Sequence, residues 1–231
     1  MKFRLMAVAA AAFVVAAGAA SAQDITSDKG KLSYALGFKT GADAAELTSR
    51  GEQLDVNSII KGVQDAYAKK QPAVPVDQLQ KVLQDMQARQ VAKSKAEWDK
   101  ASADNKVKSD AFINANKAKA GVKVLPSGVQ YRVIEPGTGA KPTMANTVQL
   151  EVAGPYAFGE RPAQARPAQS IPAIKVSQIE MPAMREVIQQ MPVGSKWEVA
   201  LPADKAYGAD PRTGFPPNVA VVFEIKLVSA K

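Results

Sequence analysis

Residues 77–120 read DQLQKVLQDMQARQVAKSKAEWDKASADNKVKSDAFINANKAKA, and this stretch decides how the chain is organised. Its 44 residues include neither proline nor glycine, and most of them are good helix formers. The stretch predicts one helix, Asp77–Ala120, with Gly121 as its natural stop. At about 1.5 Å per residue, such a helix is roughly 65 Å long. That length exceeds the width of a domain of this size, so we expect the helix to extend beyond one body.

The polarity of this helix changes along its length. Its first turns carry an apolar stripe with helical spacing, which predicts packing at that end: Leu79, Val82, Leu83 and Met86. Between Lys93 and Asp110 the only large apolar residues are Trp98 and Val107, so we expect no packing there. A helix that is polar on all sides usually bridges two bodies through solvent. The alternative is a helix that lies along one globular domain, whereas a coiled coil is disfavoured because the heptad stripe lapses.

The N-terminus has the pattern of a secretory signal peptide, predicted at residues 1–22. Lys2 and Arg4 precede an apolar run that is too short to span a membrane, and Ala20-Ser21-Ala22 forms the cleavage site. Cleavage lowers the formal net charge from +8 to +6, and no block of like charges appears. We therefore expect an exported, periplasmic protein with no nucleic-acid partner and no stable membrane insertion.

The chain has no cysteine and no histidine. Their absence excludes disulfides, thiolate zinc sites, cysteine nucleophiles and histidine-based triads. We expect no metal and no cofactor, and the fold must be held by its core or by association.

The segments on either side of the long helix differ in character. Residues 23–76 predict a small helical region that is too short to bury much apolar surface alone, so we expect it to dimerise. Residues 121–231 predict a separate domain of short strands broken by proline and glycine, with a short helix at Met184–Met191. The strands are expected at 129–134, 147–152, 196–201 and 219–228. Residues 154–170 contain three prolines and are expected to form a bulging loop or an irregular edge. An antiparallel sheet wrapped on one helix gives an α+β domain.

Several motifs carry a resemblance to a known family. In the C-terminal half they are LPSGVQY (125–131), PGTGAKP (136–142), GSKWE (194–198), AYG (206–208), PPN (216–218) and VFE (222–224); in the N-terminal half they are KLSYALG (31–37) and KGVQDA (61–66). Together they resemble an FKBP-type peptidyl-prolyl cis-trans isomerase of the Mip and FkpA branch. The resemblance covers nearly all of the mature chain. It implies a homodimer of N-terminal helices, a long helical arm, and an FKBP domain at each tip.

The resemblance also implies a pocket that binds the proline ring. Tyr207 stands at the position of the family's pocket tyrosine, so it is the expected catalytic residue, and Phe223 stands at the position of a deep phenylalanine. The other expected substrate-binding residues are Met181, Met184, Phe215 and Val152. Tyr207 also has a second interpretation, as a core tyrosine whose hydroxyl finds a backbone partner.

Three pocket positions depart from the family pattern. Val152 replaces an aromatic residue, Met184 replaces the tryptophan at the pocket floor, and Pro162-Ala163 stand where a Phe-Asp pair is expected. We therefore expect a weakened site. Tyr156 and Phe158 are new to the following loop, and the sequence leaves open whether they refill the cavity or lie on the surface.

The resemblance implies an isomerase that acts on proline-containing unfolded or nascent exported proteins. The alternative is a dimeric periplasmic chaperone, a holdase with little or no isomerase activity. Methionine side chains adapt to irregular apolar partners, so Met181, Met184 and Met191 would suit such unselective binding, although we expect at least one of them to be a core residue.

Overall fold

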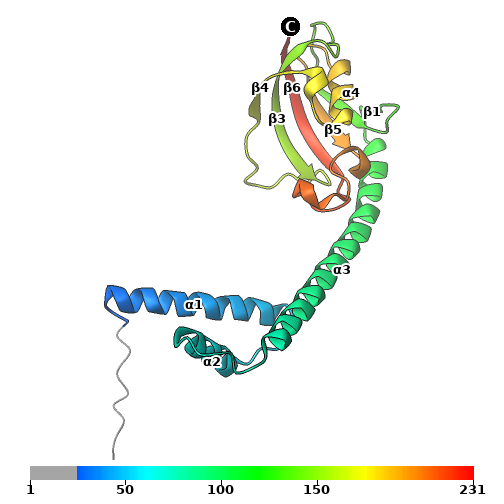
Figure 1. Ribbon diagram of the computed structural model, residues 1–231. Coiled ribbons are helices and arrows are strands. Elements are labelled where there is room, and N and C mark those ends of the chain that lie inside the picture. Colours follow the sequence, from blue (N-terminus) through cyan, green and yellow to red (C-terminus); the bar gives the residue numbers. More distant parts are fainter. Residues whose placement is uncertain (1–24) are drawn as a thin grey trace, which may run out of the picture. The chain divides into compact units, whose positions relative to one another are not determined.

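The computed structural model describes residues 25–231, so the predicted signal peptide lies outside the described residues. The elements in order are α1 (Asp28–Ser49), α2 (Val56–Tyr67), α3 (Val76–Lys117), β1 (Val122–Val124), β2 (Gln130–Glu135), β3 (Thr147–Ala157), β4 (Gln169–Lys175), η1 (Val176–Gln178), α4 (Pro182–Gln190), β5 (Lys196–Leu201), η2 (Ala203–Lys205), η3 (Pro211–Thr213) and β6 (Val221–Ala230) (Figure 1). The chain divides into two compact units, one ending at Met86 and the other comprising Gln87–Lys231. No helix of residues 25–231 is both long enough and apolar enough to cross a membrane.

In the first unit, the helices α1 and α2 have defined starts, and α2 is amphipathic. The Ser27 hydroxyl accepts the Gly30 N–H at 3.1 Å, and the Asp55 carboxylate accepts the Ser58 N–H at 2.7 Å. Both are N-caps, which satisfy donors that the first helical turn leaves free. Within these two helices, none of the described residues is buried, and Phe38 and Tyr67 are 66% and 91% exposed. The helices therefore form without a closed apolar core of their own.

The long helix was predicted over 77–120 and forms over Val76–Lys117. It begins directly after Pro75, and Gly121 adopts a positive φ of 79° in the turn that follows. Lys-to-Asp ion pairs spaced i to i+4 run along its surface, for example between Lys95 and Asp99. Exposed pairs of this kind contribute little to stability because water and salt screen them, so the local stability of α3 comes mainly from intrinsic helix propensity.

The second unit contains a six-stranded antiparallel sheet in the order β1-β2-β5-β6-β3-β4. One face of the sheet packs against α4, as Figure 1 shows, and this main core contains Val187, Ile188, Met191, Trp197, Val199, Leu201, Phe223, Ile225 and Leu227. Alternate residues of β5 and β6 point into this core because side chains alternate along a strand. Met191 is fully buried, which confirms the expected core role for a methionine.

The other face of the sheet carries a second, smaller cluster, called here the outer cluster: Ala153, Tyr156, Ala200 and Val222. Phe112 and Ile113 of α3 pack against it. Beside it, Asn116 donates to Gln130 Oε1 at 2.9 Å, and Gln130 Nε2 donates to the Ile113 carbonyl at 2.8 Å. The C-terminal end of α3 is therefore part of the folded domain.

The expectation that α3 makes no contact between Lys93 and Asp110 is wrong for its second half. Ser102, Asn105 and Ser109 hydrogen-bond to residues just before β6. The apolar-stripe criterion did not find this surface because the contacting side chains are small and polar.

The strand predictions differ from the structure mainly around residues 154–170. The strands β1 and β4 were not predicted, and β3 continues beyond Val152 to Ala157. Its register with β6 shifts between Ala153 and Tyr156, which accommodates Gly154 and Pro155 as a bulge. The ladder between β3 and β4 ends at Val152–Gln169, so beyond that point β3 pairs with β6 alone. Residues 158–168 form the expected loop.

Candidate active site

Tyr207 and Phe215 form an aromatic pair between β5 and β6. Their ring centroids are 4.6 Å apart and the ring planes are tilted by 27°. Tyr207 follows η2 and Phe215 follows η3, so two short turns bring the rings together. Both side chains are half-buried and pack against the main core. Burial raises the pKa of Tyr207 above its usual value of 10.0, so its hydroxyl remains a hydrogen-bond donor at neutral pH.

Phe223 lies on β6 and points into the main core, with only 6% of its surface exposed. The backbone of β3 comes close to its ring at Gly154. A Cβ atom at Gly154 would lie 3.3 Å from Phe223 Cδ1 and 2.7 Å from the Val222 carbonyl oxygen, and Gly154 has a φ of +113°. Only glycine meets both demands, which explains this residue in the bulge of β3.

The remaining predicted site residues also adjoin the main core. Met181 precedes α4 as its N-cap residue, Met184 lies in its first turn, and Val152 lies on β3. All three are half-buried against the same core that contains Phe223. The structure thus gathers all six predicted residues around one apolar cluster.

A hollow of about 760 Å³ lies beside β3, where the ladder with β4 has ended. We call it the β3 hollow. Of the six predicted residues, only Val152 and Phe215 line it, whereas Tyr207, Phe223, Met181 and Met184 do not. The sequence did not single out most of its other lining residues, which are Ala153, Gly154, Pro155, Tyr156, Ala157, Glu160, Arg161, Pro162, Gln164, Ala165, Arg166, Pro167, Gln169 and Pro216. Three closely spaced prolines, Pro155, Pro162 and Pro167, were the sequence feature that could have indicated these lining residues.

The β3 hollow has charged as well as apolar walls. Glu160 brings a carboxylate to it, three residues before the position at which the family's aspartate was expected. Ala163 is exposed in the same loop and does not line the hollow. The β3 hollow therefore has an acidic group, but Glu160 supplies it rather than the residue at position 163, where the family motif predicted one.

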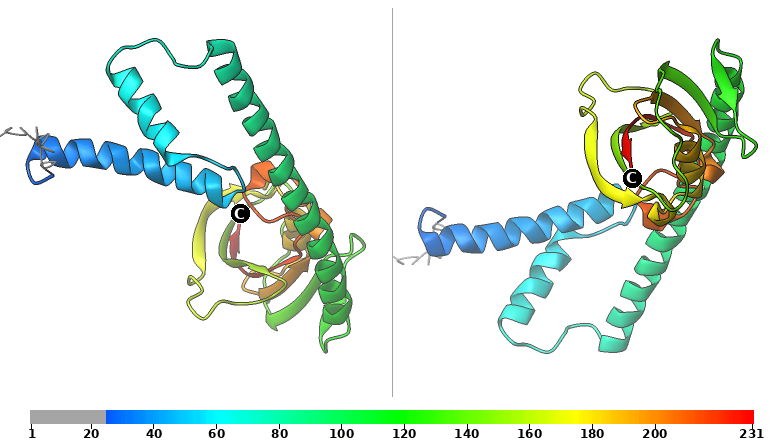
Figure 2. Two further views of the ribbon diagram at one scale, coloured as in Figure 1. Left: turned by 90° about the horizontal axis from the view of Figure 1, so that it is seen from below. Right: turned by 90° about the horizontal axis from the view of Figure 1, so that it is seen from above.

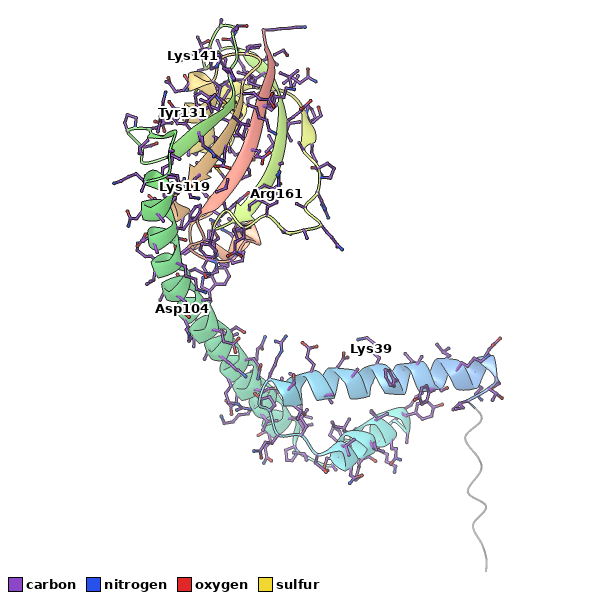
Figure 3. The ribbon with its side chains drawn as sticks, turned by 180° about the vertical axis from the view of Figure 1, so that it is seen from behind. Lys39, Asp104, Lys119, Tyr131, Lys141 and Arg161 are labelled. Carbon is purple, nitrogen blue, oxygen red and sulfur yellow. The ribbon has the colours of Figure 1, made fainter. Side chains whose placement is uncertain are left out.

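Arg161 ties the loop to the sheet. Its Nε and Nη2 donate to the Tyr156 hydroxyl, both at 3.2 Å, and Nη2 lies 3.0 Å from Glu224 Oε1. Lys196 pairs with the other oxygen of Glu224 at 3.1 Å. Figure 3, which labels Arg161, shows this side of the sheet from behind Figure 1. Because Glu224 lies on β6, these contacts connect the loop of residues 158–168 to the centre of the sheet.

The two aromatic residues that are new to this segment occupy different places. Tyr156 is buried in the outer cluster and also lines the β3 hollow. Phe158 packs against the main core and is not among the lining residues. Neither is a free surface aromatic. Within residues 25–231, no three His, Cys, Asp or Glu side chains are placed to hold a metal ion.

Two known families match separate parts of the chain. The family described as the domain amino terminal to FKBP-type peptidyl-prolyl isomerase matches residues 29–133, and the FKBP-type peptidyl-prolyl cis-trans isomerase family matches residues 173–228. Residues 134–172 lie between the two matches and contain β3 and most of the lining of the β3 hollow. Two of the three departures from the family pattern, Val152 and Pro162-Ala163, lie in this gap, whereas Met184 lies within the second match.

Relatives match over much longer stretches. The chain is 39% identical over 234 residues to the outer membrane protein MIP of Legionella longbeachae, covering 100% of this chain and 98% of the relative. It is 34% identical over 200 residues to the FKBP-type peptidyl-prolyl cis-trans isomerase FkpA of Aeromonas hydrophila, covering 85% and 74%. The crystal structure of FkpA from Escherichia coli matches with a TM-score of 0.66 at 27% identity, over 89% of this chain and 98% of that one. These matches show that the chain belongs to the FKBP-type peptidyl-prolyl cis-trans isomerases of the Mip and FkpA kind.

Proposed function

We propose that this chain is a periplasmic prolyl isomerase that assists the folding of exported proteins and turns over X–Pro bonds more slowly than a relative with a full aromatic pocket. The observation that carries this proposal is the stacked pair of Tyr207 and Phe215, half-buried on the core that contains Phe223. In this proposal, Tyr207 and Phe215 are the part of the family's proline-binding pocket that this chain retains. The walls that Val152 and Met184 supply are aliphatic or thioether, so the site holds less aromatic surface than the family pattern implies.

The proposed mechanism needs no covalent chemistry. Rotation about an X–Pro bond crosses a barrier of about 18–20 kcal/mol that amide resonance sets. A site lowers this barrier by binding the twisted amide more tightly than the planar one. In this proposal Phe215 and Val152 contact the proline ring, and the protonated Tyr207 hydroxyl donates a hydrogen bond to the substrate backbone. Glu160 serves as the polar group at the edge.

Restoring the missing side chains tests the claim of a weakened site. The triple variant Val152→Tyr, Ala163→Asp and Met184→Trp should raise kcat/KM in a protease-coupled assay on peptides with Leu or Phe before Pro. Because Glu160 already lines the β3 hollow, the double variant Val152→Tyr and Met184→Trp is the matched control, and we expect it to account for most of the gain. Native turnover equal to that of an intact-pocket relative, or no gain in either variant, would contradict the proposal.

We propose a periplasmic location on the basis of the predicted signal peptide. The name of the Legionella longbeachae relative, outer membrane protein MIP, supports export to the cell envelope. The test is osmotic-shock fractionation combined with N-terminal sequencing, which should give Gln23 as the first residue of the mature chain. Recovery of the uncleaved chain in the cytoplasm would exclude this location.

We further propose that the first unit forms a homodimer. An apolar groove of about 990 Å³ runs between α1 and α2, and its walls include Leu36, Ile59, Ile60 and Val63. Figure 2 shows the two helices from below and from above. Groove-lining residues Ile60 and Val63 are 50% and 55% exposed, which is costly for apolar side chains unless a partner covers them.

Two glycines in α1 support a second copy as that partner. Gly37 and Gly41 line the groove four residues apart, and a Cβ atom at either position would meet no described atom within 4 Å. Glycine in a helix interior costs about 1 kcal/mol relative to alanine. No contact within the described chain explains that cost, whereas the close approach of another helix does.

The alternative function is a chaperone without significant isomerase activity. The exposed apolar residues of α1 and α2 favour it, since they suit unselective binding of unfolded chains as well as dimerisation. A proline-free client separates the two functions. Suppression of its aggregation by a Tyr207→Ala variant at the native level, together with no detectable native turnover of X–Pro peptides, would establish the chaperone function alone.

A further inference from the structure

The rim of the site is formed by residues 215–218, which lead into β6. Phe215 and Pro216 line the β3 hollow, and Phe215 stacks on Tyr207. At the end of this segment, Asn218 adopts a φ of +54°, a left-handed conformation that asparagine adopts more readily than most other residues besides glycine. Its backbone N–H donates to the Gly208 carbonyl at 2.7 Å, which joins the rim to the turn after Tyr207. Further hydrogen bonds hold this segment in place.

Those contacts come from one face of α3. Asn105 Nδ2 donates to the Pro217 carbonyl at 2.9 Å, and Asn218 Nδ2 donates to Ser102 Oγ at 2.7 Å. Ser109 Oγ donates to the Asn218 carbonyl at 2.7 Å. The three helix residues are spaced three and four apart, so they form one continuous stripe. The stripe reaches the rim more than 100 residues further along the chain.

Ser109 is the most buried residue of this stripe. Only 2% of its surface is exposed, and its hydroxyl also accepts the Ala220 N–H at 2.7 Å, so both of its hydrogen-bonding roles are used at the start of β6. Serine and asparagine are weaker helix formers than alanine, and buried polar groups are retained where they have specific partners. The stripe therefore lowers helix propensity in exchange for defined contacts with the rim.

We infer that Ser102, Asn105 and Ser109 of α3 are positioning residues of the isomerase, which hold residues 215–218 so that Phe215 stays stacked on Tyr207 at the mouth of the site. The inference rests on the proposed function, because it assigns these residues to the same pocket. A helix that connects the two units thus also determines the shape of the substrate site.

The ordinary alternative is that the stripe only fastens α3 to the sheet. The chain provides a matched control for that role. Asn116 is also a buried polar residue of α3, 5% exposed, but it donates its hydrogen bond to Gln130 on β2 rather than to the rim. An Asn116→Ala variant loses a helix-to-sheet hydrogen bond without touching residues 215–218.

The test compares kinetics of the full-length mature protein. Asn105→Ala and Ser109→Ala should each raise KM for a prolyl peptide at least threefold with kcat within twofold of native, because the competent rim is populated for less of the time. Asn116→Ala should leave KM within twofold of native. Asn105 is only half-buried, so its variant remains informative if Ser109→Ala does not fold. Equal KM values in the Asn105 and Asn116 variants would overturn the inference.

A second measurement works even without turnover. In protein labelled with ¹⁵N-phenylalanine, the amide resonance of Phe215 should shift or broaden in Asn105→Ala and Ser109→Ala but not in Asn116→Ala. An unchanged Phe215 resonance in the first two variants, or the same change in all three, would overturn the inference. If the native protein turns over no X–Pro peptide, the proposed function fails, and the Phe215 resonance alone decides whether α3 positions the rim.

Discussion

The Tyr207 ring lies against the Phe215 ring with a centroid separation of 4.6 Å, so Tyr207 adjoins the β3 hollow through Phe215, which lines it. This relationship separates the contribution of the Tyr207 ring from that of its hydroxyl. A Tyr207→Phe variant keeps the stack, whereas Tyr207→Ala removes it, and such aromatic pairs contribute about 0.5–1.5 kcal/mol beyond their buried area.

We expect Tyr207→Phe to lower kcat by up to about tenfold, the equivalent of about 1.4 kcal/mol of transition-state stabilisation, and Tyr207→Ala to lower kcat/KM further. The measurement is a protease-coupled assay, with circular dichroism to confirm folding. If both variants keep native kcat/KM, Tyr207 is a core tyrosine rather than a catalytic residue.

The pH dependence of turnover provides another prediction about Tyr207. Burial raises the pKa of its hydroxyl, so the group stays protonated at every pH below its usual value of 10.0. Since the chain has no histidine or cysteine, kcat/KM should be flat between pH 6 and 9. Above pH 10 the unfolded state loses this proton before the folded state does, so the contribution of Tyr207 to stability should decline as pH rises. A change in kcat/KM with a midpoint between pH 6 and 9 would contradict this prediction.

Asp210, at the start of the turn that leads to Phe215, should titrate at an unusually low pH. Hydrogen bonds from the Arg212 side chain and then from its backbone N–H lower the pKa of this carboxyl from 3.8 to about 2. Because the folded-state pKa is depressed, the stabilisation is fully present above about pH 4 and is lost as pH falls through about 2. An NMR titration of the side-chain carboxyl should give this midpoint, and Arg212→Ala should move it back towards 3.8. An unchanged midpoint in that variant would contradict the assigned cause.

The proposed dimer predicts different effects for two substitutions close together on α1. Gly41→Gln places a bulky polar side chain in the groove, so it should shift sedimentation velocity towards the monomer. Lys39→Gln introduces the same residue outside the groove lining, where Lys39 forms an exposed ion pair with Asp43, and it should leave the dimer intact. If the Gly41→Gln variant keeps the sedimentation coefficient of the native dimer, α1 is not part of the dimer interface.

The contacts of α3 define which fragment should fold. A fragment of residues 87–231 retains the compact second unit and should be a folded monomer. A fragment of residues 115–231 lacks Ser109 and Phe112, which contact the start of β6 and the outer cluster. Losing such buried contacts costs several kcal/mol, so its melting temperature should be lower by at least about 10 °C. Equal melting temperatures would show that α3 does not stabilise the sheet.

Trp197 should tolerate one substitution much better than another. Its indole stacks on Tyr131 at 4.2 Å, but its buried Nε1 has no hydrogen-bond partner among the described residues. Trp197→Phe keeps an aromatic ring and removes the unsatisfied donor, so we expect a change in unfolding free energy within about 1.5 kcal/mol. Trp197→Ala should cost about 3–5 kcal/mol. Urea denaturation measures both, and a loss for Trp197→Phe as large as that for Trp197→Ala would contradict this prediction.

The sequence by itself determined the elements whose cause is local. The long helix follows from an unbroken run of helix formers, because helical hydrogen bonds join residues only four apart, and its observed bounds, Val76–Lys117, differ little from those predicted. The strand at 196–201 forms over the predicted residues because its alternation is clear. The family motifs lie in α1, α2, three strands of the sheet and the loops between them, so membership of the FKBP-type isomerases was evident from sequence.

Only the tertiary structure decided which surfaces meet. The polar middle of α3 indicated solvent exposure, yet Ser109 is buried there because its partners, Asn218 and Ala220, come from a distant segment. Likewise, Glu160 reaches the β3 hollow because β3 continues through the bulge at Gly154. A hydropathy pattern indicates which face of one element is apolar, but it does not indicate hydrogen bonds between elements. Contacts of small polar side chains over more than 100 residues therefore emerge only when the chain is folded.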